Sequence, residues 1–232
     1  MSNNESSEEG ISRRNIHEKA IEEHIDRIQR EFRRGFELLQ KYPRSVTIFG
    51  SSMTDPKSKR YELACEAARR IAKETGYAIA SGGGPGIMEA VSKGAQEGGG
   101  TSIGLRINLL RERTANPYLS DGMDFTYFFT RKTMLIFAAE AYIYFPGGFG
   151  TYDELFSTLT LIQTNKIPRV PIILFDSSYW NPLKDMITKT MLAEDRTIDP
   201  QDMGLFEITD SIDRMIEIIK KAPTSEWWRN IN

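Results

Sequence analysis

The stretch that decides the fold is residues 141–154, which read Ala-Tyr-Ile-Tyr-Phe-Pro-Gly-Gly-Phe-Gly-Thr-Tyr-Asp-Glu. Its first five residues are an apolar run typical of a buried strand, and a helical pattern from Leu155 to Ile162 follows it. A strand that passes through glycines into a helix presents free backbone N–H groups at the positive end of that helix. The stretch therefore predicts an anion site, with the carboxylate of Glu154 near the first turn of the same helix.

A second glycine loop lies earlier in the chain. Tyr77–Ser81 reads as a buried strand, and Gly82-Gly83-Gly84-Pro85-Gly86 connects it to a helical stretch that starts at Ile87. Pro85 suits the first turn of a helix, and glycines let the backbone approach a ligand closely. One such loop is weak evidence, because tight turns also use glycine for steric reasons. Two loops at the carboxyl ends of strands favour a ligand site, because open α/β sheets bind ligands there.

Strands and helices alternate along the rest of the chain. Strands are expected at residues 46–49, 77–81, 101–105, 124–130, 141–145 and 170–175, and helices at 57–75, 86–97, 131–139, 152–164, 179–192 and 211–221. A long irregular loop is expected at residues 106–123. Alternation with short buried strands predicts an α/β protein: a Rossmann-like, doubly wound parallel sheet with helices on both faces and right-handed crossovers.

We divide the chain into four segments. Residues 1–14 are polar and lack periodicity, so we expect them to be disordered. Residues 15–41 form an N-terminal amphipathic helix, because apolar residues recur there at spacings of three and four. Residues 44–222 are expected to form one Rossmann-like nucleotide-binding domain. Residues 223–232 form a C-terminal tail whose tryptophan pair we expect to dock onto the body or an oligomer contact.

Composition argues against several classes of function. The 232 residues carry a formal net charge of −2, which gives no global attraction to nucleic acid or to an anionic membrane. The arginines of the helix at 15–41 are diluted by acidic residues, so a solvated face is favoured there. No apolar stretch of about 18 residues is present, which excludes a membrane span. The polar, acidic start is unlike a signal peptide, and we expect a cytoplasmic protein.

The supply of histidine and cysteine limits the chemistry. The single cysteine, Cys65, excludes an intramolecular disulfide and is expected to fill a small apolar position. The two histidines, His17 and His24, both lie in the N-terminal helix, outside the α/β domain. A Ser-His-Asp triad or a histidine-ligated metal is therefore not expected, and we expect neither metal nor cofactor. Acid–base chemistry would use carboxylates, arginine, lysine, tyrosine or water.

Known nucleotide motifs do not fit the first glycine loop. It lacks the Gly-x-Gly-x-x-Gly spacing of dinucleotide-binding proteins, and no Lys-Ser/Thr pair follows it as in a P-loop. Hydride transfer and ATP hydrolysis are thus poorly supported.

Arg131 and Lys132 bring positive charge to the same edge of the predicted sheet. They follow the expected strand 124–130 and open the next helix, so three strand ends converge there. In the alternative interpretation Arg131 forms a structural ion pair with Glu154, and Lys132 is solvated. We favour a functional interpretation, because charges at the carboxyl ends of parallel strands lie where ligands bind.

Together these motifs resemble those of the LONELY GUY (LOG) family, whose members have often carried the name "possible lysine decarboxylase". The resemblance rests on residues 146–154, on Arg131-Lys132 and on residues 82–90, and it covers roughly residues 44–192. The Pro-Gly-Gly-x-Gly-Thr-x-x-Glu motif is the specific part. The chain looks like the longer branch of the family, which tends to form higher oligomers than dimers.

The resemblance implies a phosphoribohydrolase that cleaves the N-glycosidic bond of adenosine 5′-monophosphate (AMP), plain or N6-prenylated. The products would be the free base and ribose 5-phosphate. By position, Glu154 and Arg131 would be the catalytic pair. The loop 147–151 would hold the 5′-phosphate, Lys132 would help at the nucleotide, and Gly82–Gly84 would line the ribose. The substrate-binding residues would be Gly82, Gly83, Gly84, Lys132, Gly147, Gly148, Phe149, Gly150, Thr151 and Asp153.

The residue chemistry agrees with this implication. A carboxylate such as Glu154 can stabilise an oxocarbenium-like transition state or orient the attacking water. Arg131 suits an electrostatic clamp, because a guanidinium does not readily deprotonate. The sequence does not identify the donor to the departing base, nor does it decide between AMP and prenylated AMP.

Two other functions compete with this one. A pyridoxal-phosphate decarboxylase needs a Schiff-base lysine and a cofactor site; Lys132 is a nominal candidate, but no such site is recognisable, and we reject this interpretation. A non-catalytic nucleotide sensor, or a carrier like the molybdenum-cofactor carriers, stays open, although a simple phosphate binder gains nothing from Glu154.

We also expect a homo-oligomer, either a dimer or a hexamer-of-dimers type of assembly. The apolar helices at 132–139 and 152–164 would supply dimer contacts near the site, and the N-terminal helix would extend the assembly.

Overall fold

The computed structural model describes residues 5–108 and 116–223, with side chains from residue 17 onward. Within them, one parallel sheet of seven strands forms the centre of the molecule, in the order β4-β3-β2-β1-β5-β6-β7. The expected α/β doubly wound fold is confirmed. The strands are β1 Ser45–Phe49, β2 Ala78–Ser81, β3 Ser102–Ile107, β4 Asp121–Phe125, β5 Tyr142–Tyr144, β6 Ile172–Phe175 and β7 Glu207–Thr209.

The strand order reverses between β1 and β5. From β1 the chain builds outward through β2, β3 and β4, and it then returns to the other side of β1 as β5, with Thr47 opposite Tyr142. The crossovers before and after this point lie on opposite faces of the sheet. The loops that leave β1 and β5 are therefore free to diverge, which makes their carboxyl ends the expected ligand position of this fold.

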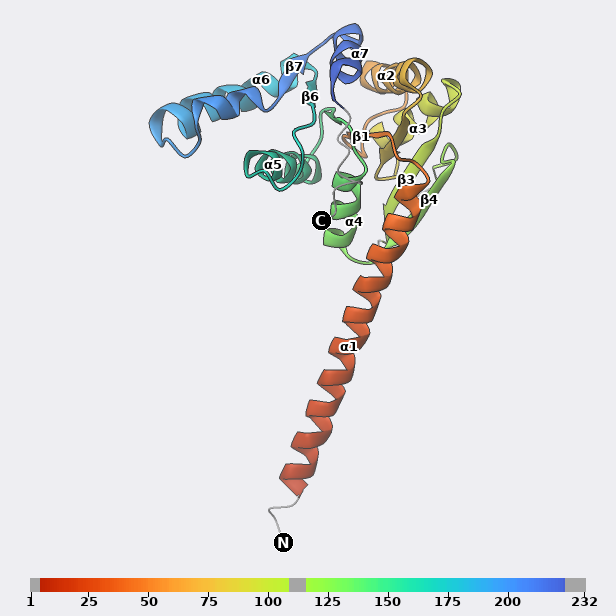
Figure 1. The fold of residues 1–232 in the computed structure, drawn as a ribbon, viewed down its shortest axis with the longest axis vertical. Helices are drawn as coiled ribbons and strands as arrows, with labels where there is room; N and C mark the ends of the chain where they lie inside the picture. The colour runs from red at the N-terminus through yellow and green to blue at the C-terminus, as the bar shows by residue number, and fades with distance from the viewer. Residues whose placement is uncertain (1–4, 109–115, 224–232) are drawn as a thin grey trace.

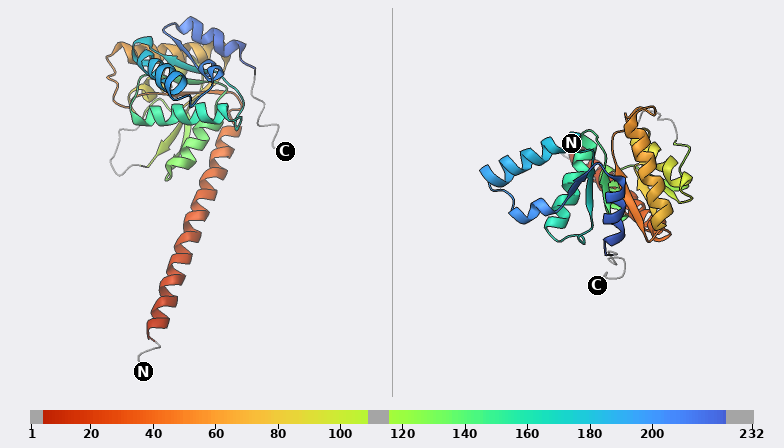
Figure 2. Two further views of the ribbon diagram at one scale, coloured as in Figure 1. Left: turned by 90° about the vertical axis from the view of Figure 1, so that its left-hand side faces the viewer. Right: turned by 90° about the horizontal axis from the view of Figure 1, so that it is seen from above.

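Helices cover both faces of the sheet (Figures 1 and 2). On one face lie α2 Lys59–Thr75, α3 Ile87–Glu97 and α7 Ile212–Lys221, whose apolar side chains pack with Ile48 and its alternate neighbours. On the other face lie α4 Phe128–Phe137, α5 Phe149–Gln163 and α6 Ser177–Met186, which pack with Phe49. Successive strand residues thus enter two separate cores, as a sheet covered on both faces requires.

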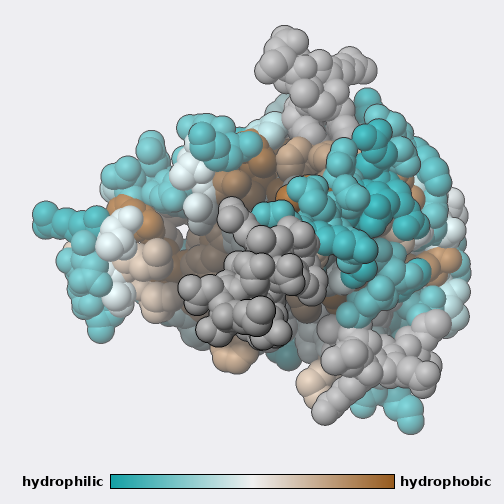
Figure 3. Space-filling view, turned by 90° about the horizontal axis from the view of Figure 1, so that it is seen from below, coloured by the Kyte–Doolittle hydropathy of each residue, from teal (hydrophilic) through white to brown (hydrophobic). Residues whose placement is uncertain are grey.

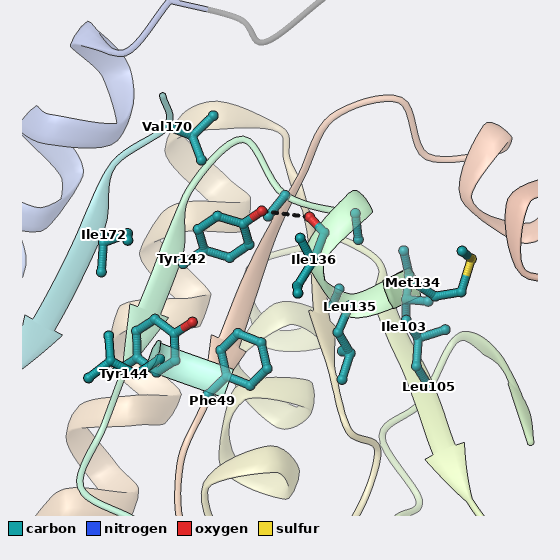
Figure 4. Close-up of a cluster of buried hydrophobic side chains, with 14 of the residues drawn as sticks. Phe49, Ile103, Leu105, Met134, Leu135, Ile136, Tyr142, Tyr144, Val170 and Ile172 are labelled. Carbon is teal, nitrogen blue, oxygen red and sulfur yellow. Dashed lines mark hydrogen bonds between the residues drawn. The ribbon is translucent and has the colours of Figure 1, made fainter. Parts of the chain in front are cut away.

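The core under α4 and α5 joins the helices to the central strands (Figure 4). Tyr142 of β5 donates a hydrogen bond from its hydroxyl to the carbonyl of Ile136 in α4, at 2.7 Å. Phe49 of β1 stacks on Tyr144 of β5 with ring centroids 4.8 Å apart. The Tyr144 hydroxyl in turn donates to the backbone carbonyl of Glu154 in α5, at 3.2 Å. Strands β1 and β5 therefore fix the positions of α4 and α5 relative to the sheet.

The N-terminal helix α1, Glu5–Gln40, projects far beyond the body (Figure 1). It includes residues 5–14, which we expected to be disordered; residues 1–4 lie outside the described residues. Of its side chains from residue 17 onward, only those of the last turns are buried, as Leu38 and Leu39 show, whereas Ile21 and Ile25 are 56% and 50% exposed. Gly35 lets α1 approach α4 closely, because a β-carbon there would lie 2.5 Å from the Met134 sulfur.

The boundary expected between β4 and α4 was wrong, and the early start of α4 has a tertiary cause. The strand expected at 124–130 is β4 at Asp121–Phe125, and α4 begins at Phe128 rather than at residue 131. The carboxylate of Glu31 in α1 accepts a hydrogen bond at the start of α4, and no local sequence pattern signals this contact.

The C-terminal third of the domain differs in detail from the expectation. α6 continues into a π-helical stretch, Ile187–Glu194, and a short 3₁₀ helix, Pro200–Gly204, follows. Strand β7 was missed because its three residues are all half-buried and lack an apolar pattern. The segment 109–115 of the expected irregular loop and the tryptophan pair of the tail lie outside the described residues. In the part of the chain that is described, no helix is both long and apolar enough to cross a bilayer.

Candidate active site

The second glycine loop ends at an open helix N-terminus. Gly148 precedes the first residue of α5 with extended backbone (φ −89°, ψ −157°) and contributes no capping side chain. Thr151 and Tyr152 donate their N–H groups to the Gly148 carbonyl at 3.0 and 3.2 Å. Within the described structure this leaves the N–H groups of Phe149 and Gly150 as donors for an anion. A β-carbon on Gly148 or Gly150 would meet no other part of the described structure within 4 Å.

Neighbouring elements hold the start of this loop in place. Ser51, which follows β1, donates its N–H to the Pro146 carbonyl at 3.0 Å. Tyr179 of α6 donates its hydroxyl to the Gly147 carbonyl at 2.5 Å. A β-carbon on Gly147 would overlap the Thr151 hydroxyl. The loop is thus fixed where it leaves β5 and unobstructed where α5 begins.

The first glycine loop is packed against the same Ser51. The Ser51 carbonyl accepts the N–H of Ile87, the first residue of α3, at 2.9 Å. Gly86 has a positive φ of 69°, and a β-carbon there would overlap the Ser51 carbonyl oxygen. Only glycine suits both constraints. Ser51 therefore connects the two glycine loops.

The two cations of α4 contact different elements. Arg131 donates from Nε to the Leu105 carbonyl of β3 at 2.7 Å, and its Nη2 lies where a β-carbon of Gly82 would be. Lys132 forms an ion pair with Asp153 of α5 at 2.6 Å and donates to the Ser157 hydroxyl at 3.2 Å. Lys132 is therefore not simply solvated, as the alternative interpretation had it. The predicted site residues of both loops and of α4 lie at one edge of the sheet.

Glu154 is the chemically unusual group of this edge. Burial raises the pKa of its carboxyl from 4.5 to about 7; the charges of Lys132 and Arg131 lower this pKa, and that of Asp153 raises it further. The Oε2 atom is buried and has no hydrogen-bond partner within the described residues. A buried, unpartnered carboxylate is unfavourable by itself, so such a group is a candidate for chemistry on a ligand. At neutral pH it can serve as base, acid or electrostatic partner.

Sequence reasoning missed two residues of this arrangement, Ser51 and Tyr179. Ser51 follows the strand 46–49 in a Gly-Ser-Ser turn, and strand order alone would have pointed to that turn once β1 was placed at the switch point. No local signal identifies Tyr179, because its contact with Gly147 depends on how α6 packs. Two apolar side chains near these loops are strongly exposed: Met53, at 91%, and Phe149, at 97%.

The described residues offer few alternatives for a cofactor or a metal. No group of three or more histidine, cysteine, aspartate or glutamate side chains among them could hold a metal ion. Cys65 is half-buried and donates to Glu97, and burial raises the pKa of its thiol to about 11, so it is a poor nucleophile at neutral pH. The amine of Lys132 is occupied by Asp153 and Ser157.

Comparisons of the sequence with a family model and with known proteins point to one family. Residues 88–219, more than half of the chain, match the model of the family described as "Possible lysine decarboxylase". A cytokinin riboside 5′-monophosphate phosphoribohydrolase from Rhodococcoides fascians is 29% identical over 150 residues, which are 62% of this chain and 74% of that protein. The Arabidopsis thaliana enzyme of the same name, LOG3, is 27% identical over 180 residues, 77% of this chain and 81% of the relative.

A similar solved structure belongs to a protein with a different named role. The molybdenum cofactor carrier protein of Chlamydomonas reinhardtii superposes with a TM-score of 0.58 at 18% identity, over 77% of this chain and 97% of that one. At this identity the likeness concerns the fold alone.

Proposed function

The chain belongs to the LONELY GUY (LOG) family, whose family model is described as "Possible lysine decarboxylase", and from this premise we propose that it is a nucleoside 5′-monophosphate phosphoribohydrolase. Its substrate would be AMP or an N6-prenylated AMP, and its products the free base and ribose 5-phosphate. The observation that carries the proposal is the carboxyl of Glu154, whose Oε2 is buried without a hydrogen-bond partner among the described residues and whose pKa is raised to about 7, on the helix whose N-terminus is open to an anion.

In the proposed mechanism, the N-terminus of α5 binds the 5′-phosphate through the backbone of residues 147–151. Binding energy at the phosphate, away from the scissile bond, orients the sugar for reaction. Ionised Glu154 then stabilises the positive charge that develops on the ribose as the N-glycosidic bond breaks, or it activates the attacking water.

Arg131 and Lys132 would have separate tasks. Arg131, against the first glycine loop, would clamp the nucleotide electrostatically and help to keep Glu154 ionised. Lys132 bridges α4 and α5 through Asp153, so it would hold the helix that carries Glu154 as well as add positive charge for the nucleotide. Because the Lys132 amine is bound to Asp153 and Ser157, it is a poor candidate for a Schiff-base lysine. This argues against a pyridoxal-phosphate decarboxylase.

The deciding experiment is chromatography of AMP and of isopentenyladenosine monophosphate after incubation with the purified protein. Release of free base and ribose 5-phosphate by the wild type, lost in Glu154→Gln, is the expected result. The relative rates identify the preferred substrate. Tight nucleotide binding without base release from either compound would instead favour the carrier or sensor function suggested by the fold of the molybdenum-cofactor carriers.

We further propose that the protein assembles as a homo-oligomer. The projecting part of α1 exposes Ile21 and Ile25, and the first turn of α4 exposes Phe128 and Phe129, at 61% and 50%. Figure 3 shows hydrophobic surface in a recess on the left of the view, beside the projecting part of the molecule that contains α6. Surface of this kind is typical of a contact between subunits. Light scattering at micromolar concentration should give a multiple of the 26.4 kDa chain mass, and a monomer would refute the proposal. The cytoplasmic location stays a prediction.

A further inference from the structure

A second buried carboxylate lies outside the candidate active site. Glu31 of α1 is 7% exposed. Its Oε1 accepts the backbone N–H of Thr126 at 2.7 Å, and its Oε2 accepts the Thr130 hydroxyl at 2.6 Å and the N–H of Tyr127 at 3.5 Å. These three donors lie 95 to 99 residues away in the sequence. Both oxygens of the carboxylate are therefore used to hold one turn of another helix.

That turn is the start of α4, which has no capping side chain of its own. Tyr127, at the N-cap position, makes no side-chain bond to the helix. Glu31 takes over this role from α1, and its negative charge lies at the positive end of the α4 dipole. The Tyr127 carbonyl accepts the Thr130 hydroxyl at 2.8 Å and the N–H of Arg131 at 3.3 Å. The turn held by Glu31 thus leads directly into the two cations.

A second polar contact joins α1 to the same turn, because His24 Nδ1 and the Tyr127 hydroxyl are 2.5 Å apart, but this contact is exposed. Glu31 is the buried one of the two polar anchors. Farther along, Gly35 approaches Met134, and Phe36 packs edge-on against Phe137 with centroids 5.5 Å apart. These apolar contacts involve the second half of α4, and hydrophobic contacts are not directional. Hydrogen bonds to a buried carboxylate are directional and strong, so they define where the first turn lies.

We propose that Glu31 is a positioning residue for the reaction: by capping α4 from another helix, it fixes Arg131 and Lys132 relative to Glu154. This inference rests on the proposed function only in so far as these three residues act on the nucleotide. It predicts that loss of the Glu31 charge changes the electrostatics of Glu154 and not just the stability of the fold.

The test compares Glu31→Gln with Glu37→Gln, a matched change at an exposed position of the same helix. The charged or titratable groups that act on Glu154 are Arg131 and Lys132 from α4, Asp153 on α5 itself, and Tyr144 from β5. Because the two cations lower the pKa of Glu154, their displacement should raise it. We expect Glu31→Gln to lower kcat about 10-fold or more and to move the acid limb of the pH–rate profile to higher pH. Glu37→Gln should change neither.

A readout independent of turnover separates this inference from the proposed function. The Glu154 carboxyl can be titrated by carbon NMR, with Glu154→Gln used to assign its signal. A higher midpoint in Glu31→Gln than in Glu37→Gln supports the inference even if no nucleotide is hydrolysed. A wild-type midpoint in a folded Glu31→Gln protein would overturn it, as would a fall in melting temperature with unchanged kcat and pH profile.

A second pair of variants covers the case in which Glu31→Gln does not fold. Thr130→Val removes one donor to Glu31 and nearly keeps the volume of a fully buried side chain, whereas Thr130→Ser keeps the hydroxyl. The valine variant should show the same direction of change in kcat and in the Glu154 midpoint, and the serine variant should restore both. Equal behaviour of the two variants would contradict the positioning role.

Discussion

In the first glycine loop a β-carbon on Gly86 would overlap the Ser51 carbonyl and one on Gly82 would overlap the Arg131 guanidinium. In the second loop a β-carbon on Gly148 or Gly150 would meet none of the described residues within 4 Å. Gly86 of the first loop is thus explained by the protein's own backbone, and Gly82 by the position of the Arg131 side chain. The glycines at the start of α5 are not explained in this way, and we attribute them to a ligand that must approach the backbone. Two loops that look alike in sequence therefore differ in what their glycines do.

Among the variants that test this difference, Gly86→Ala should have the largest effect on stability. The new β-carbon meets backbone atoms of Ser51 and Ser52, and the residue keeps a positive φ of 69°. We expect a loss of about 3 kcal/mol or more in the free energy of unfolding, from overpacking and backbone strain together. Urea denaturation measures it. A change below about 0.5 kcal/mol, the usual size for an unimportant surface site, would mean that this loop is not packed as described.

Glu154→Gln tests the carboxyl on α5, the helix that follows the second glycine loop. Because the folded-state pKa, about 7, lies above the ordinary 4.5, the folded protein favours the neutral carboxyl. This stabilising contribution is present below pH 4.5 and is lost as the pH rises through 7. The variant should therefore gain stability over the wild type as the pH rises from 4.5 to 7, and the gain should reach about 3 kcal/mol by pH 8.

Thermal melts of both proteins across this pH range measure the effect, with the exposed Glu37→Gln as control. A difference between Glu154→Gln and the wild type that does not change with pH would show that the carboxyl is not destabilised by burial.

Gly82→Ala should separate function from stability within the first loop. Here the β-carbon meets the ends of flexible side chains, those of Arg131 and Met88, which can move aside. We expect a nearly unchanged melting temperature but an about 30-fold fall in kcat, since the guanidinium is displaced. Steady-state kinetics beside a melt decides this. Full activity would remove Arg131 from the proposed mechanism.

Gly150→Ala is expected to have the smallest effect, and an opposite sign for stability. Alanine fits the open space at the second position of α5 and favours the helix, so stability should rise by about 0.5 kcal/mol. The methyl group would crowd a phosphate bound at the helix N-terminus, and we expect KM for AMP to rise about 10-fold. An unchanged KM would place the phosphate elsewhere.

The sequence predicts the fold well because its main signals are local. Short apolar runs and helical periodicity give the alternation of strands and helices, and the two glycine loops mark the edge of the sheet where Arg131, Lys132 and Glu154 meet. The same signals cannot give contacts between distant segments. The start of α4 depends on Glu31 of α1, and the ion pair of Lys132 with Asp153 depends on how α4 and α5 pack. Ser51 became visible only with the strand order.

The central claim joins the open N-terminus of α5 to the carboxyl of Glu154, and one kinetic comparison tests both. Base release from AMP and from adenosine, which lacks the phosphate, is measured with the wild type and with Glu154→Gln. We predict a kcat/KM for AMP about 100-fold or more above that for adenosine, and loss of AMP cleavage in the variant. Equal values for the two substrates, or undiminished cleavage by Glu154→Gln, would contradict the account.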